Sequence, residues 1–355
     1  MLLHSNAVLS ALSLFLLINQ SSAQTYSSCN PVQGSCPADT ALGQSISVDF
    51  TNGASSQFTA SGSPSYGSDG AEFTVAQKGD SPTIISSWYI MFGHVEFVIK
   101  AAPGQGIVSS AVLQSDCLDE IDWEWLGGEN DQVQSNYFGK GITVSYNRGA
   151  FHGAQGNHDE FHTYSVDWTA EQIVWAIDGQ TVRVLTQADA ESGQYPQTPM
   201  QVKVGVWAGG DSSNEQGTIN WAGGLVDYSN GPFTMYLKSI SVQDYSTGSS
   251  YSYSGTSGTW QSIESNGGQI TTAASAVTSA VSNNAPLAFG AGDSSDTTST
   301  RTGWPWDASA TVGIATSVAS STDAYTLPSS GRVNCIPIAL CASNLIAGLL
   351  LGFWS

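Results

Sequence analysis

The sequence predicts an all-β fold in which two antiparallel sheets pack as a jelly-roll sandwich. Between residues 24 and 245, short runs of alternating apolar and polar residues, such as GHVEFVIKA, TYSVDWT and QIVWAIDG, are separated by Gly, Asn, Asp and Pro. This alternation is typical of half-buried strands. No long segment in this range has the 3.6-residue period of a helix. The 38 Gly and the aromatic content of 10% also suit strands and turns.

The charge balance excludes one class of partner. The 355 residues include 9 Lys and Arg against 29 Asp and Glu, which gives a formal net charge of -20. A protein that binds nucleic acid needs a basic face to neutralise phosphates, and so few cations do not provide one. We therefore expect no nucleic-acid partner and favour a neutral ligand.

The N-terminus predicts a signal peptide over residues 1–23. An apolar run from Ala7 to Ile18 is followed by the small residues SSA at 21–23, which is the pattern that precedes signal-peptidase cleavage. The alternative is a membrane anchor, but this run of about a dozen residues is shorter than the roughly 20 that span a bilayer. We therefore expect a secreted protein.

The C-terminus predicts a GPI-attachment signal over residues 322–355. An apolar stretch runs from Ile336 to Trp354 with no basic residue after it, whereas a stop-transfer helix normally has Lys or Arg on its cytoplasmic side. Small residues and a polar spacer precede the stretch, so we expect a lipid at Ser320 or Ser321 as the link to the membrane. A plain single-pass helix is the alternative.

Residues 246–321 predict a stalk rather than a second domain. The segment contains STGSSYSYSGTSGTW and DSSDTTSTRTG, and a chain so rich in Ser and Thr buries too little apolar surface to fold. We expect an O-glycosylated stalk, or merely a flexible linker, with nothing catalytic in it. The folded domain is then residues 24–245.

Three cysteines remain in the expected mature chain. Secretion permits disulfides, and Cys29 with Cys36 would close a short loop near the N-terminus. Cys117 is then the odd cysteine, and we expect it to be buried.

The segment DEIDWEWLGG at residues 119–128 is the most informative about chemistry. In a strand, alternate side chains share a face, so Glu120, Asp122 and Glu124 point one way and the apolar residues between them point the other. The apolar set must face the core between the sheets, which leaves the three acids in a row on an open face. Like charges about 7 Å apart along a strand raise each other's pKa. Nothing structural requires this arrangement, so it indicates a function.

Such a row fits the cleavage of a glycosidic bond with retention of configuration, which uses two carboxyl groups about 5 to 5.5 Å apart. Residues i and i+4 of a strand have Cα atoms about 13 Å apart, but two Glu side chains that lean toward each other over a concave sheet recover much of this distance. Asp122 can hydrogen-bond either Glu, which would keep one ionised and the other protonated. Symmetry alone does not say which Glu has which role.

The same residues resemble a known family. EIDWE at residues 120–124 matches the E-x-D-x-E signature of glycoside hydrolase family 16, and DEIDWEWLGG resembles its fungal Crh branch of cell-wall transglycosylases. The motifs FHTYSVDWT, VWAIDG and VGVWAGGD follow in the expected order. The resemblance implies a concanavalin-like jelly roll with the acids in a cleft, Glu120 as nucleophile, Glu124 as proton donor and general acid/base, and Asp122 as the residue that assists them.

The resemblance also implies a reaction and its partners. Chitin is the donor, the glycosyl-enzyme forms on Glu120, and a β-1,3- or β-1,6-glucan chain end replaces water as acceptor, so that chitin and glucan become cross-linked. We expect a monomer at the plasma membrane or in the cell wall. One alternative is a chitinase or β-glucanase that uses water at the same site. Another is a non-catalytic wall-binding protein, against which the three intact acids argue.

Candidate sugar-binding residues lie near the Gly-rich segments VWAGGD and NWAGG, whose placement resembles the donor site of the family. Aromatic rings stack on sugar faces, which makes Trp207 and Trp221 candidates, although an aromatic residue of a β-domain is usually part of the core. Lys203 and Thr218 flank these segments and would hydrogen-bond the sugar, or else be ordinary surface residues. His162 borders the cleft in the family, or packs in the core. Glu124 would also contact the substrate.

We expect no cofactor and no metal. Sites for Ca²⁺ collect oxygen ligands from curved loops, whereas the acids of residues 120–124 lie along one straight strand. No cluster of His and Cys suggests zinc. The predicted chemistry therefore depends on amino-acid side chains alone.

Overall fold

The structure is a computed structural model that describes residues 27–142 and 147–272. The predicted signal peptide, the GPI-attachment residues Ser320 and Ser321, the apolar C-terminus and most of the predicted stalk lie outside the described residues. Within the described ranges, no helix has both the length and the apolar character needed to cross a bilayer.

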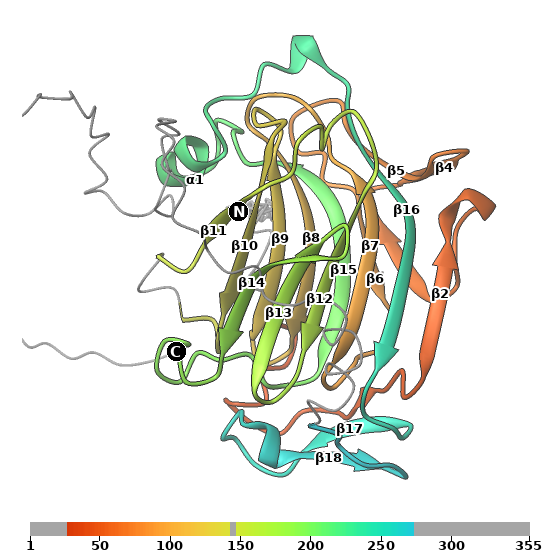
Figure 1. Cartoon of the computed structure of the whole chain (residues 1–355), viewed down its shortest axis with the longest axis vertical. Coiled ribbons are helices and arrows are strands. Elements are labelled where there is room, and N and C mark those ends of the chain that lie inside the picture. The colour runs from red at the N-terminus through yellow and green to blue at the C-terminus, as the bar shows by residue number, and fades with distance from the viewer. Residues whose placement is uncertain (1–26, 143–146, 273–355) are drawn as a thin grey trace, which may run out of the picture. The chain divides into compact units, whose positions relative to one another are not determined.

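Two antiparallel sheets face each other and form the predicted sandwich (Figure 1). The first sheet has seven strands, in the spatial order β11 (Ala150–Gly153), β10 (Gln132–Phe138), β9 (Glu120–Leu126), β8 (Ile107–Ser115), β15 (Met200–Ala208), β6 (Thr83–Ser86) and β3 (Phe58–Ser61). The second has the order β14 (Gln180–Thr186), β13 (Gln172–Ile177), β12 (His162–Trp168), β7 (Gly93–Lys100), β16 (Phe233–Asp244), β5 (Gly70–Val75) and β4 (Ser65–Gly67), with β2 (Ser45–Asp49) paired to β16.

The connections between strands contain only short helical turns in the described ranges. These are the α-helix α1 (Gln216–Trp221) and the 3-10 turns η1 (Phe50–Asn52), η2 (Tyr228–Asn230) and η3 (Trp260–Ser262). The all-β fold class is confirmed.

The hydrophobic core lies between the two sheets. Along β7 the residues alternate between buried and half-buried over all eight positions, because successive side chains of a strand point to opposite faces. From β9, Trp123 and Trp125 are fully buried, and the ring of Trp125 lies 4.6 Å from that of Tyr164 on β12. At roughly 25 cal/mol per Å², the burial of each such ring stabilises the sandwich by about 4 kcal/mol.

The segment after residue 245 corrects the predicted domain boundary. β17 (Ser250–Tyr253) pairs with β18 (Ile263–Asn266) and with β1 (Asp39–Thr40), and these strands lie at one end of the sandwich (Figure 1). Tyr251 is fully buried and donates a hydrogen bond of 2.6 Å to Asp244. The expectation of a stalk from residue 246 was wrong because the alternation in SYSY puts both Tyr side chains on one face. An existing core needs no more apolar surface than this to hold a short strand.

The N-terminal disulfide is confirmed. Cys29 and Cys36 are bonded, with their sulfur atoms 2.01 Å apart, and Cys117 is buried and free as predicted. The loop that this disulfide closes packs on the C-terminal segment, where a Cβ added to Gly258 would approach Val32 to 2.7 Å. The two ends of the described chain therefore support each other.

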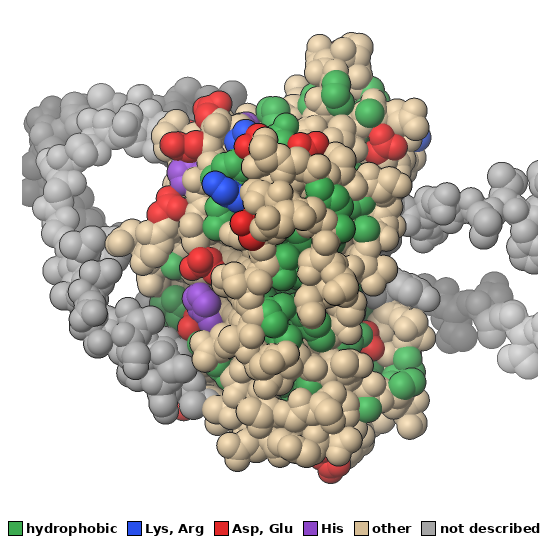
Figure 2. Space-filling model, turned by 90° about the vertical axis from the view of Figure 1, so that its right-hand side faces the viewer, with side chains coloured by type: hydrophobic (Ala, Val, Ile, Leu, Met, Phe, Trp, Pro, Cys, Tyr) green, Lys and Arg blue, Asp and Glu red, His purple; other side chains and the backbone are tan. Residues whose placement is uncertain are grey.

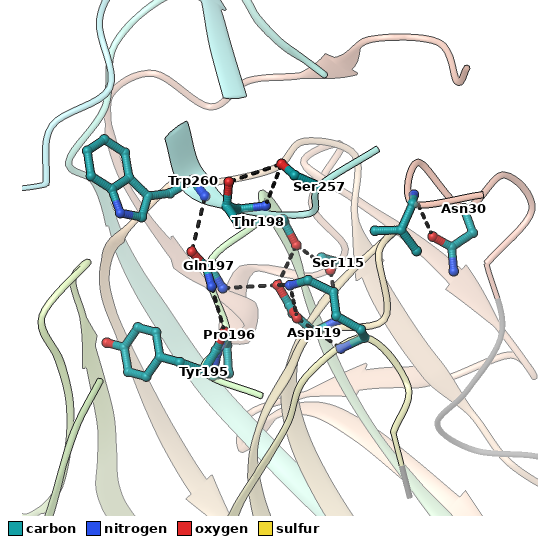
Figure 3. Close-up of polar contacts among 12 residues, drawn as sticks. Asn30, Ser115, Asp119, Tyr195, Pro196, Gln197, Thr198, Ser257 and Trp260 are labelled. Carbon is teal, nitrogen blue, oxygen red and sulfur yellow. Dashed lines mark hydrogen bonds and ion pairs between the residues drawn. The ribbon is translucent and has the colours of Figure 1, made fainter. Parts of the chain in front are cut away.

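A buried ion pair holds the turn before β9. Asp119 is fully buried and accepts hydrogen bonds from Lys140 Nζ at 2.5 Å and from Thr198 Oγ1 at 2.6 Å (Figure 3). The backbone N–H of Gln197 also donates to Asp119, and the side-chain oxygen of Gln197 accepts from the backbone N–H of Trp260. This network ties the residue before Glu120 to the C-terminal segment.

One face of the molecule has little positive charge. The face shown in Figure 2 carries mostly uncharged side chains, several acidic ones and few basic ones. This distribution agrees with the formal net charge of -20 and suits a neutral polymer better than an anionic one.

Candidate active site

The three acids of β9 lie on the face of the seven-stranded sheet that points away from the core. β10 places Phe138, Asn136 and Gln134 directly opposite Glu120, Asp122 and Glu124, in that order. The prediction that these acids are open to solvent was wrong, because their exposed fractions are 3%, 0% and 0%. The three acids therefore form a desolvated site.

Glu120 is linked by hydrogen bonds to β8 directly and to β15 through a residue of β8. Gln114 of β8 donates from Nε2 to Oε2 of Glu120 at 2.7 Å, and Lys203 of β15 donates from Nζ to Oε1 of Gln114 at 2.5 Å. Burial raises the pKa of Glu120 to about 7, against the lowering effects of its hydrogen bonds with Asp122 and Gln114 and of the charge of Lys203. These partners favour the ionised form of Glu120.

Asp122 has the opposite surroundings. Within the described ranges, no N–H or O–H group donates to its carboxyl oxygens. Its side-chain hydrogen bond is with Glu120, and two carboxyl groups form one only when either of them is protonated. Burial raises the pKa of Asp122 well above its ordinary value, and the charges of Glu120 and Glu124 raise it further. Above about pH 7, where Glu120 ionises, the remaining proton is therefore favoured on Asp122.

Arg148 supplies a second buried positive charge near the acids. Its exposed fraction is 5%, its guanidinium lies 4.5 Å from the ring centroid of Phe138, and its charge lowers the pKa of both Glu120 and Asp122. The backbone oxygen of Arg148 accepts a hydrogen bond of 2.8 Å from Arg183. The sequence did not single out either arginine.

Two tryptophans lie beside the cross-strand neighbours of Glu124. Ser110 and Gln134 are its cross-strand neighbours on β8 and β10. The indole of Trp207 donates to Ser110 Oγ at 3.3 Å, and that of Trp221 donates to Gln134 Oε1 at 3.2 Å. Their rings stack with centroids 6.2 Å apart. Both tryptophans therefore lie beside the acids. They do not lie in turns, because Trp207 is the last but one residue of β15 and Trp221 is the last residue of α1.

The other predicted substrate-binding residues divide into two groups. Lys203 lies in the site, and Thr218 is buried in α1, where its backbone oxygen accepts from Ala222. His162 does not lie in the site, because β12 belongs to the second sheet. Its Nδ1 lies 2.8 Å from Asp178, and its ring contacts Tyr164, which packs in the core between the sheets. His162 is half-buried at the start of β12.

Comparisons with known proteins agree with this geometry. Residues 50–223 match the model of "Glycosyl hydrolases family 16". "Crh-like protein 4" of Aspergillus fumigatus is 58% identical over 320 residues, which cover 86% of this chain and 70% of that protein. The protein of the same name from Botryotinia fuckeliana is 54% identical over 311 residues, or 85% and 81% of the two chains. The chain belongs to the Crh-like proteins of glycosyl hydrolases family 16.

Solved structures of the family have the same fold. The "Apo Crh5 transglycosylase" is 50% identical with a TM-score of 0.65, and it matches 67% of this chain and 100% of its own. The "Crh5 transglycosylase in complex with NAG" is 51% identical with a TM-score of 0.66 over the same shares. The jelly roll and the resemblance are confirmed, and this Crh-like chain is an enzyme of the glycosidase and transglycosylase class.

Gln114 is a site residue that the sequence reasoning missed. It lies opposite Glu120 because residues 115–119 form the turn between β8 and β9, with hydrogen bonds between Ser115 and Asp119. The turn at residues 115–119 could have been used to predict a hairpin. Because the loop between two strands sets their register, that hairpin would have placed Gln114 opposite Glu120.

The described ranges hold no group of three or more His, Cys, Asp or Glu side chains that could bind a metal ion. The site is built instead from one row of carboxyl groups with amide and ammonium donors beside it.

Proposed function

We propose that this protein is a retaining transglycosylase that cleaves chitin and transfers the released chain to β-glucan in the fungal cell wall. One observation carries the proposal. Glu120 has donors and positive charge on one side and a protonatable carboxyl group, Asp122, on the other. These surroundings favour an ionised Glu120 and support it as the nucleophile.

In the first step, Glu120 attacks the anomeric carbon of the donor sugar. The glycosidic carbon–oxygen bond breaks, and Glu124 transfers its proton to the leaving oxygen. A glycosyl-enzyme ester on Glu120 and a free chain end result. Asp122 assists by donating a hydrogen bond to Glu120, which holds the carboxylate of the nucleophile in position in a site that excludes water.

In the second step, an acceptor hydroxyl attacks the same carbon. Glu124, now a carboxylate, takes the proton of that hydroxyl, and the ester bond to Glu120 breaks. When the acceptor is a β-glucan end, the product is a chitin–glucan cross-link; when it is water, the product is shortened chitin. Transfer requires that the site binds the acceptor sugar more effectively than water.

Chitin as donor is supported by a relative. The solved Crh5 transglycosylase complex contains NAG, the N-acetylglucosamine unit from which chitin is built. The stacked pair of Trp207 and Trp221 is mostly buried and lies beside Glu124, and we propose that its exposed edge contacts a sugar ring. Lys203 and Thr218 are proposed as further substrate contacts, and the β-glucan acceptor follows from the resemblance.

The proposed location follows from the segments outside the described residues. Secretion by residues 1–23 and a GPI lipid at Ser320 or Ser321 would place the enzyme at the plasma membrane or in the wall. The Ser- and Thr-rich chain after residue 272 would be an O-glycosylated spacer.

The test uses the secreted full chain with chitin oligosaccharides and a fluorescent laminarin oligosaccharide. Glu120→Gln and Glu124→Gln remove one acid each, and Glu96→Gln is the matched control because Glu96 lies half-buried on β7 of the second sheet. We expect the label to move to a larger product with wild type and Glu96→Gln only. Shortened chitin without labelled product would indicate a hydrolase, and bound but unchanged sugar would indicate a wall-binding protein.

A further inference from the structure

The amide of Gln114 connects two charged groups across three strands. Gln114 is buried on β8, opposite Glu120 of β9 on one side and Gln201 of β15 on the other. Its Nε2 donates to Glu120 at 2.7 Å, and its Oε1 accepts from Lys203 at 2.5 Å. Both ends of one amide are therefore engaged, one by a carboxyl group and the other by an ammonium group.

Lys203 fixes which end of the amide faces Glu120. An ammonium group only donates hydrogen bonds, so it must take the carbonyl oxygen of Gln114. The NH₂ group then points to Glu120 and cannot be exchanged for the oxygen without placing an N–H against the ammonium. The carboxylate of Glu120 thus has a donor whose orientation is set two strands away.

This arrangement matters because the charge of Glu120 changes during the proposed reaction. The carboxylate loses its charge when the ester forms and regains it when the ester breaks. A donor held at one oxygen keeps the side chain in position and stabilises the carboxylate as it leaves. The other titratable or charged groups that act on Glu120 are Asp122, Lys203 and Arg148.

We propose that Gln114 is a positioning residue for the nucleophile, with its amide oriented by Lys203 so that its NH₂ group donates to Glu120. This inference rests on the proposed function for its catalytic meaning. The hydrogen bond itself can be measured without turnover, and the two proposals can therefore fail separately.

The experiment compares Gln114→Met, Gln114→Glu and Gln201→Met with wild type, all as full chains. Met keeps the length of the side chain and removes the donor, whereas Glu keeps an acceptor for Lys203. Gln201 is the matched control, because its Nε2 donates to the backbone oxygen of Ser86 at 2.7 Å instead of to an acid. The carboxyl carbon of Glu120 is titrated by ¹³C NMR, with Glu120→Gln used to assign the signal, and transfer rates and thermal unfolding are measured in parallel.

We expect Gln114→Met to raise the pKa of Glu120 by about one unit, because a hydrogen bond to a charged group has about this effect. Gln114→Glu should raise it further by adding a like charge. In Gln114→Met, kcat should fall about tenfold or more at an unchanged KM, and the acidic limb of the pH–rate profile should move to higher pH. Gln201→Met should change none of these.

Two results would overturn the inference: a Glu120 titration that is the same in wild type and Gln114→Met, or an equal shift in Gln201→Met. A wild-type chain without transfer activity would contradict the proposed function. In that case the NMR titration still decides whether Gln114 holds Glu120.

Discussion

Lys140 Nζ lies 2.5 Å from Oδ1 of Asp119, a fully buried carboxyl group one residue before Glu120. The strand that carries the three acids thus begins at a charge pair, and that pair also receives hydrogen bonds from Thr198 and Gln197. The position of Glu120 depends on this turn as much as on the sheet.

Removal of Lys140 should therefore destabilise the fold. Lys140→Met leaves the charge of Asp119 buried without its partner, which costs about 3 kcal/mol or more. The double variant Asp119→Asn/Lys140→Met should recover part of the loss. Lys78→Met is the control, because Lys78 is 58% exposed and its partner Asp211 keeps the hydrogen bonds of Ser213 and Tyr228. Urea unfolding measures all three; equal losses for Lys140→Met and Lys78→Met would contradict the role of the buried pair.

Truncation after residue 245 should unfold or strongly destabilise the domain. It removes Tyr251 and Ile263 from the core together with the hydrogen bond from Tyr251 to Asp244. A chain that ends after residue 272 retains these contacts and should unfold at a temperature close to that of the full chain. If both truncated chains unfold alike, the C-terminal strands do not support the domain.

The stability should fall as pH rises from about 4.5 to about 7. Burial raises the pKa of Glu120 in the folded state to about 7 from its ordinary value of 4.5. As pH rises, the unfolded chain therefore releases this proton first, which stabilises the unfolded state relative to the folded state. The raised pKa of Asp122 acts in the same direction. Glu120→Gln should flatten the pH dependence of the urea midpoint over this window. A decline of the same size in wild type and variant would show that other groups cause it.

The stacked tryptophans should affect donor binding more than chemistry. Trp221→Leu removes the ring that stacks on Trp207 and the hydrogen bond to Gln134, so KM for chitin oligosaccharides should rise about threefold to tenfold at a similar kcat. Tyr66→Leu is the control, because Tyr66 stacks on Phe50 instead of on the pair beside the acids. Steady-state kinetics distinguishes the two, and an unchanged KM for Trp221→Leu would remove the pair from the donor site.

Local sequence pattern was sufficient where a property depends on one strand. The alternation of residues 120–126 placed the acids on one face and Trp123 on the other, and the contact of Trp123 with Tyr164 of the opposite sheet confirms this. The same pattern could not predict the burial of the acids, because burial depends on strands other than the one that carries them.

Properties that depend on strand pairing were harder to predict from the sequence. Gln114 and Lys203 are 89 positions apart, and they meet because β8 and β15 pair directly. His162 was a candidate cleft residue because its motif is typical of the family. In the structure it lies on β12, which belongs to the second sheet and not to the sheet that carries the acids. The Ser-rich composition after residue 245 concealed two strands, because Tyr251 supplies the apolar face that average composition does not reveal.

The most direct test of the account is to trap the covalent intermediate. In Glu124→Gln, a chitobioside with an aryl leaving group that needs no proton should still react with Glu120, while the second step is slowed because no general base activates the acceptor. Mass spectrometry of the intact protein and of its peptides should find one donor glycosyl group on Glu120. The absence of an adduct, or an adduct on another residue, would contradict Glu120 as the nucleophile.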